Sequence, residues 1–236
     1  MTRARVRALI IAIVLVIGAA VAVAVARRQP TAARPRPTLL LLTSLPLMFG
    51  ENFSVDGGSP TLSALQARYR VVPISVTDEA DLAKGRLLLM AHPLAQPAED
   101  LVALDTWVRD GGRVLLLADP ALDWPSQRPL GDPLRPPPMF MDTGLLSHWG
   151  LRLDAPDERG SQSRTLGGQQ ILTVSPGRLS GKCTISADGL VAACRVGQGR
   201  ASIIADADFL NVEALGAPAQ HNLDALLAEL AALERR

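Results

Sequence analysis

Four apolar runs constrain the fold of this chain more than any other feature. They occupy residues 38–44 (TLLLLTS), 86–92 (RLLLMAH), 113–119 (RVLLLAD) and 201–210 (ASIIADADFL). Apolar runs without polar alternation are typical of strands that are covered on both faces, as in parallel sheets. We therefore predict a three-layer α/β domain with a mainly parallel sheet.

Helical patterns connect the apolar runs. Residues 60–69 follow Ser59, a favourable N-cap, and residues 97–112 form an amphipathic pattern that ends in Gly-Gly. Strands that alternate with helices in this way predict right-handed βαβ units. The other predicted elements are an edge strand at 70–75 containing Pro73, a short helix at 141–150 and a final helix at 217–234.

The second half of the chain interrupts this alternation. A proline-rich loop covers 120–140, and loops of this length in a compact domain are usually functional or mobile. Short strand and hairpin patterns then fill 151–200. We interpret this segment as a β-hairpin-rich insertion before the last βα unit.

The N-terminal segment predicts a membrane anchor. Residues 8–26 contain no charged residue over 19 positions, which is enough for a helix that spans a bilayer. A cleaved signal peptide is the alternative, because Ala24-Val25-Ala26 resembles a cleavage site. The predicted organisation is an anchor (1–28), a Pro/Arg linker (29–37) and an α/β domain (38–236) in the periplasm, attached to the bacterial inner membrane by one transmembrane helix.

Cys183 and Cys194 are the only cysteines. A two-residue turn at Asp188-Gly189 would pair position 185 with 192 and 183 with 194, at hydrogen-bonded positions of a hairpin. This register predicts a disulfide, and two reduced, buried thiols are the alternative. The spacing lacks the C-x-x-C knuckle of metal sites, so no metal is expected there.

Charge and composition argue against nucleic-acid binding. Five arginines lie in the first 28 residues, which leaves 19 basic and 23 acidic residues in the remainder. Only 3% of the residues are aromatic. A mildly acidic domain with few stacking side chains is a poor nucleic-acid binder.

Polar residues gather where the predicted strands end, and the carboxyl ends of parallel strands are where ligands bind in open α/β sheets. The strand-end carboxylates have a structural alternative, which is to accept hydrogen bonds from loop amides, and the histidine could be a partly buried loop residue. The candidate ligand- or partner-binding residues are Ser44, Glu51, His92, Asp119, Asp123, Asp206, Asp208 and Asn211.

Familiar catalytic motifs are absent from the sequence, including G-x-S-x-G, the P-loop and a strand-linked G-x-G-x-x-G. We therefore expect no enzyme, no cofactor and no metal. The predicted function is a non-catalytic binding module. The alternatives are a hydrolase that uses Asp119, Asp206 and Asp208, with or without a metal, and a purely structural envelope protein.

Three segments resemble the gliding-motility auxiliary and ABC-type uncharacterised transport domain family. They are LDTWVRDGGRVLLLADP (104–120), GRASIIADADFLN (199–211) and the helix NLDALLAEL (222–230). The resemblance implies a flavodoxin-like or class I glutamine amidotransferase-like fold without the catalytic cysteine. It also implies an accessory role beside ABC transporter subunits or other envelope proteins, with glycan as a possible ligand.

Overall fold

The computed structural model describes residues 35–49 and 58–235. The predicted anchor at 1–28 and most of the predicted linker lie outside these residues. Within the described ranges no helix is long and apolar enough to cross a membrane. This finding does not support the transmembrane helix in the predicted fold class, and it does not support the predicted single-pass location in the inner membrane. Both predictions are corrected in this respect.

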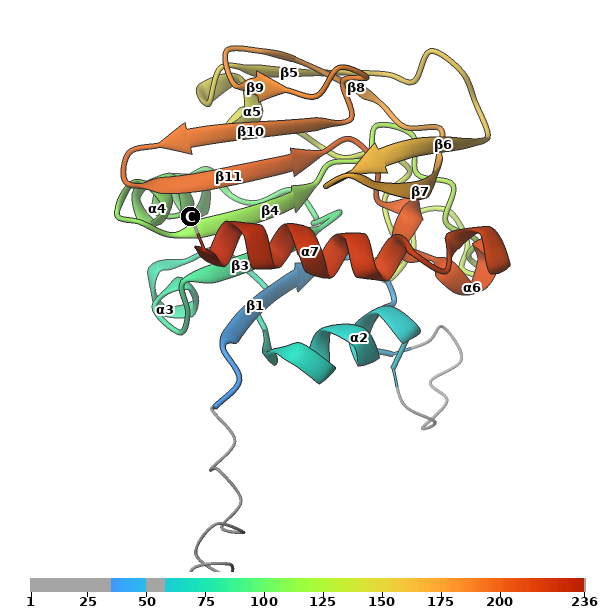
Figure 1. The fold of residues 1–236 in the computed structure, drawn as a ribbon. Helices are drawn as coiled ribbons and strands as arrows, with labels where there is room; N and C mark the ends of the chain where they lie inside the picture. The colour runs from blue at the N-terminus through green and yellow to red at the C-terminus, as the bar shows by residue number, and fades with distance from the viewer. Residues whose placement is uncertain (1–34, 50–57, 236) are drawn as a thin grey trace, which may run out of the picture. The chain divides into compact units, whose positions relative to one another are not determined.

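The main sheet has seven strands in the order β2-β1-β3-β4-β11-β10-β9 (Figure 1). β10 is antiparallel to β11 and to the edge strand β9, whereas all other neighbours are parallel. The parallel core and the edge position of β2 agree with the sequence prediction. The strands are β1 (Thr38–Thr43), β2 (Arg70–Pro73), β3 (Leu87–Ala91), β4 (Arg113–Leu117), β9 (Thr184–Ile185), β10 (Val191–Val196) and β11 (Gly199–Ile204).

Helices cover both faces of the parallel strands (Figure 1). The helices α2 (Pro60–Arg68) and α7 (Asn222–Arg235) cover one face, and α3 (Glu79–Leu82), α4 (Ala98–Arg109) and α5 (Leu145–His148) contribute to the other. In β1, Leu39 and Leu41 enter the first core cluster, whereas Leu40 and Leu42 enter the second. This two-sided burial explains why the strand sequences are apolar without alternation.

The final helix begins later than its sequence pattern predicts. Gly216, at a φ of +70°, and Pro218 interrupt the pattern, so Ala217–Ala219 forms the 3-10 helix η2 and α7 starts at Asn222. Two further short elements precede this region, the 3-10 helix η1 (Asp208–Leu210) and the helix α6 (Val212–Leu215).

The insertion predicted for 151–200 is shorter in the structure. Its first part forms two separate two-stranded sheets, in which β5 (Leu151–Asp154) pairs with β8 (Arg178–Gly181) and β6 (Ser161–Leu166) pairs with β7 (Gln169–Val174). β9 and β10 instead extend the main sheet, because β10 pairs with β11 over its full length. The sequence pattern identifies hairpins here, but it cannot identify the sheet that each strand joins.

Cys183 and Cys194 form the predicted disulfide. The predicted register is also confirmed, since Ile185 pairs with Ala192. The turn is longer than two residues, because Ser186 N–H donates to the Val191 carbonyl. The cysteines therefore occupy a non-hydrogen-bonded position rather than the predicted hydrogen-bonded one, in agreement with their Cα separation of 4.8 Å.

Candidate functional site

The parallel strands β1, β3, β4 and β11 end at the same edge of the sheet, as predicted, and we call it the carboxyl edge. The register aligns Thr43 with Ala91, Ala91 with Leu117, and Leu117 with Ile204. The residues that follow these ends therefore lie close together. This edge collects most of the sequence-predicted site residues, and their contacts decide what each of them can do.

Asp119 ties the loop after β4 to the loop after β11. Its Oδ1 accepts a hydrogen bond from Ala121 N–H and its Oδ2 accepts one from Ala207 N–H, both at 2.8 Å. The side chain is fully buried. Burial raises the pKa of this carboxyl to about 6, and the amide hydrogen bonds oppose the rise.

Asp206 ties the β6–β7 hairpin to the segment that follows β11. Its Oδ1 accepts from Phe209 N–H at 2.8 Å and its Oδ2 accepts from Val174 N–H at 2.9 Å. Complete burial raises the pKa of Asp206 well above its usual value, and the nearby charges of Asp119 and Asp208 add to this rise.

Asp208 is the third member of this carboxyl cluster. Its Oδ2 accepts from the backbone N–H of Asp123 at 2.8 Å. Burial, followed by the charge of Asp119, raises the pKa of Asp208 to about 7. Asp123 thus contributes a main-chain donor to the cluster.

The carboxyl cluster holds loops through hydrogen bonds to backbone amides. A carboxylate-dependent hydrolase needs carboxylate oxygens that face a substrate, but both oxygens of Asp119 and of Asp206 already accept backbone N–H groups. In the described part of the chain, no group of three His, Cys, Asp or Glu side chains is arranged to hold a metal ion. These hydrogen bonds agree with the structural interpretation of these acids.

His92 fastens the proline-rich loop to the end of β3. It is fully buried, its φ is +47°, and its Nε2 lies 2.9 Å from the carbonyl oxygen of Pro137. Burial lowers the pKa of this imidazole. A neutral ring that donates from Nε2 leaves Nδ1 as an acceptor, which has no partner among the described residues. His92 is thus a positioning residue.

The remaining predicted residues have separate roles. Ser44 donates from its hydroxyl to the His92 carbonyl at 2.5 Å. Asn211 caps α6, with its Oδ1 accepting from Ala214 N–H at 3.4 Å. Glu51 lies outside the described residues. The structure therefore brings His92, the carboxyl cluster and Ser44 to one edge, while Asn211 serves the helix that follows.

The carboxyl edge also exposes a set of apolar side chains that the sequence analysis did not identify. Among the described residues, seven large hydrophobic side chains are exposed, and six of them follow the ends of β1, β3 and β4. The exception is Val102 on α4. We call the six the apolar edge, and they are Phe49, Leu94, Leu130, Leu134, Met139 and Met141.

Three residues of the apolar edge share a cavity. Phe49, Leu94 and Leu134 line a hollow of about 310 Å³, together with Ser44 and Arg128. The sequence signal for this surface was the segment GDPLRPPPMFMD, in which Leu and Met residues interrupt the prolines. Prolines hinder regular structure, so such apolar residues have no helix or strand face to bury.

No family model and no curated protein matches the chain. Two solved structures share its fold with a TM-score of 0.51. One is the exo-beta-1,4-mannosidase Op5Man5 from Opitutaceae bacterium strain TAV5, at 15% identity. The match includes 88% of this chain but only 38% of the mannosidase chain. The other is the mmIFT52 N-terminal domain, at 14% identity, with coverage of 82% of this chain and 97% of that chain.

These likenesses show the fold alone, because the identities are low. The comparisons give no support to a glutamine amidotransferase fold or to an ABC-transport role, and these two expectations are corrected. What they do support is an α/β fold with a parallel core, which agrees with the arrangement of strands and helices described above.

Proposed function

We propose that this domain is a non-catalytic binding module and that the apolar edge is its contact surface for a partner protein. The observation that carries the proposal is the location of the exposed hydrophobic side chains. Six of the seven found in the described residues follow three neighbouring strands at one edge of the sheet. Three of the six line one cavity, and exposed apolar side chains grouped in this way commonly mark an interaction site.

The surface is held in a defined shape by the buried residues beneath it. Both ends of the proline-rich loop are bonded to the strand ends or to each other. Phe140 N–H donates to the Asp119 carbonyl at 2.6 Å, and Leu122 N–H donates to the Pro138 carbonyl at 3.0 Å. The His92 ring holds the Pro137 carbonyl, next to the bond between Leu122 and Pro138. A preorganised loop loses less conformational entropy when it binds, which favours affinity.

The chemistry of the surface favours a protein over a glycan. Five of the six apolar-edge residues are Leu or Met, and Phe49 is the only aromatic one. Aliphatic and thioether side chains pack against apolar protein surfaces and adapt to them, whereas they offer no flat face on which a sugar ring could stack. The cavity lined by Leu134 can accept one apolar anchor residue of the partner.

Site-specific photo-crosslinking in the native cells tests this proposal. We expect a photo-reactive phenylalanine analogue at Leu134 to give a discrete protein adduct, and the same analogue at Val102 to give none. Val102 is the matched control, because it is 67% exposed on α4, outside the apolar edge. The substitution Leu94→Glu should abolish the adduct at position 134. Equal adducts at both positions, or an adduct that Leu94→Glu leaves unchanged, would contradict the proposal.

A further inference from the structure

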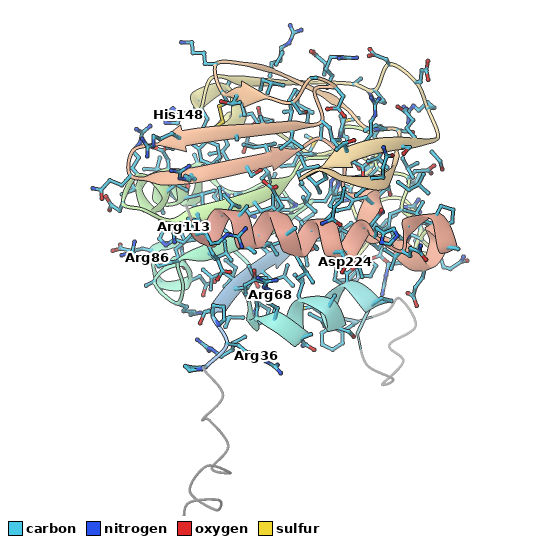
Figure 2. All side chains as sticks on the ribbon, viewed as in Figure 1. Arg36, Arg68, Arg86, Arg113, His148 and Asp224 are labelled. Carbon is cyan, nitrogen blue, oxygen red and sulfur yellow. A yellow bond between two sulfur atoms is a disulfide. The ribbon has the colours of Figure 1, made fainter. Side chains whose placement is uncertain are left out.

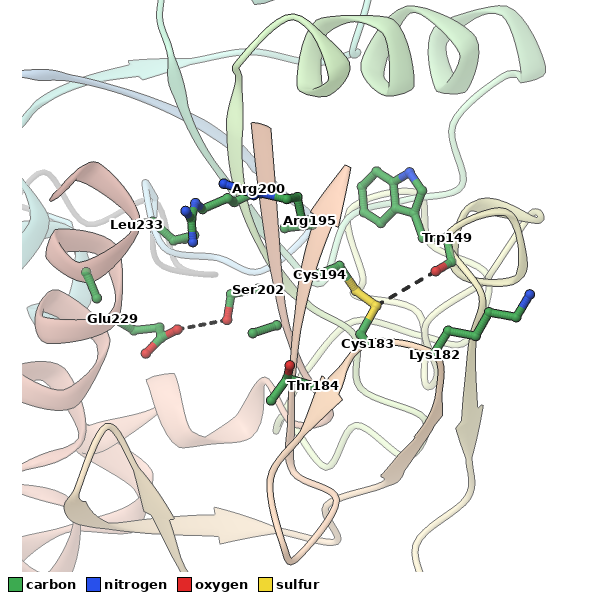
Figure 3. A pocket seen from close by; sticks show the side chains of 13 residues that line it. Trp149, Lys182, Cys183, Thr184, Cys194, Arg195, Arg200, Ser202, Glu229 and Leu233 are labelled. Carbon is green, nitrogen blue, oxygen red and sulfur yellow. Dashed lines mark hydrogen bonds between the residues drawn. A yellow bond between two sulfur atoms is a disulfide. The ribbon is translucent and has the colours of Figure 1, made fainter. Parts of the chain in front are cut away.

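A second cavity, of about 550 Å³, lies over β10 and β11 beside the C-terminal half of α7 (Figure 3). Its volume is within the usual range for small-molecule sites. Three basic side chains line it, from Lys182, Arg195 and Arg200, and Glu229 is the one acidic residue in the lining. We call this cavity the cationic groove.

The strand register concentrates positive charge at this groove. Arg195 of β10 is directly opposite Arg200 of β11, and Arg200 is in turn the register partner of Arg113 at the start of β4. Arg113 is labelled in Figure 2. Directly paired residues on neighbouring strands project from the same face of a sheet. Three guanidinium groups therefore leave adjacent positions on the face that α7 covers.

No acid in the described part of the chain neutralises this row. None of the ion pairs there involves Arg113, Arg195, Arg200 or Lys182. Like charges on directly opposite positions are destabilising. Two guanidinium groups on directly opposite positions, without an acidic partner among the described residues, are available to an anion.

The acidic residue of the groove does not cancel the row. Glu229 accepts a hydrogen bond through Oε1 from the Ser202 hydroxyl at 2.8 Å (Figure 3). This contact directs the carboxylate from α7 toward β11 (Figure 3). With three cations and one carboxylate in its lining, the groove keeps a formal excess of positive charge.

We propose that the cationic groove binds a small molecule through a phosphate or diphosphate group, with Arg195 and Arg200 as its principal ligands. The planar guanidinium fork matches two phosphate oxygens, and two neighbouring forks can hold one phosphate from two sides. Nucleic acid is disfavoured by the net acidic balance of the chain beyond its first 28 residues. The groove lies where β4 and β11 begin, at the sheet edge opposite the apolar edge, so this proposal is independent of the proposed function.

Calorimetric titration of the full chain with inorganic pyrophosphate at constant ionic strength tests the proposal. We expect saturable binding to one site and a loss of about tenfold or more in affinity for Arg195→Gln and for Arg200→Gln. Arg152→Gln is the control with the same charge change, because Arg152 lies on β5 and pairs with Asp154. Its affinity should equal that of the wild-type protein.

Glu229→Gln gives a prediction of opposite sign. This substitution removes the negative charge of the groove and keeps an oxygen that can accept from Ser202, so it should tighten pyrophosphate binding by several-fold. Thermal melting should show that all variants are folded. The proposal is overturned if the wild-type protein shows no saturable binding, if the Arg195→Gln/Arg200→Gln double variant binds as tightly as the wild type, or if Glu229→Gln weakens binding.

Discussion

The charged groups at the two edges of the parallel sheet differ in whether they have partners within the protein. At the carboxyl edge, the carboxyl cluster is buried and its oxygens accept backbone N–H groups, while the exposed surface is apolar. At the opposite edge, where β4 and β11 begin and which we call the amino edge, a row of arginines lies on neighbouring strands without an acidic partner in the described chain. The comparison teaches that the partners of a charged group, rather than its position at a strand end, decide whether the group is available to a ligand.

The largest expected effect concerns the carboxyl cluster. Asp119→Ala removes both acceptors and leaves the buried N–H groups of Ala121 and Ala207 without a partner. We expect the free energy of unfolding to fall by about 3 kcal/mol, measured by urea denaturation at pH 8. Asp119→Asn keeps one acceptor oxygen and should lose about half as much. An alanine variant as stable as the wild-type protein would show that these bonds are not structural.

The carboxyl cluster should also make the stability of the protein depend on pH. The folded protein raises the pKa of Asp119 to about 6 and that of Asp208 to about 7, so between pH 4 and pH 7 it binds more protons than the unfolded chain. This contribution to stability is complete below pH 4 and is lost as the pH rises through 6 and 7. We expect the free energy of unfolding to fall steadily across this window.

The variant that tests this pH effect is Asp208→Asn, which keeps an oxygen that can accept from Asp123 N–H. The free energy of unfolding of this variant should fall less between pH 4 and pH 7 than that of the wild-type protein, as measured by urea denaturation at several pH values. If Asp208→Asn and the wild-type protein have the same pH profile, Asp208 is not one of the groups responsible.

The smallest expected effect belongs to the amino edge. Arg200→Gln removes one like charge from the arginine row, so the free energy of unfolding should stay the same or rise by less than about 1 kcal/mol. Thermal and urea denaturation at low salt measure it. A clear loss of stability would instead indicate that Arg200 supports the C-terminal end of α7. The charged groups of both edges would then have structural roles.

Much of the fold was predictable because it depends on local patterns. The runs at 38–44, 86–92 and 113–119 are buried on both faces, and their sequences are apolar for that reason. The register of Cys183 and Cys194 followed from the hairpin pattern alone. Pairing between distant segments was not predictable, because no local pattern shows that β9 and β10 extend the main sheet.

The candidate site was predictable in place but not in role. Strand ends correctly located His92 and the carboxyl cluster at one edge. Which amides would occupy each oxygen depends on loops that are distant in sequence, such as Val174 for Asp206. The sequence by itself determined the alternation of strands and helices, because residue periodicity reports burial on each face. Only the tertiary structure decided that the acids accept backbone N–H groups and that the arginines have no acidic partner among the described residues, because hydrogen bonds and charge pairs form between segments that the fold alone brings together.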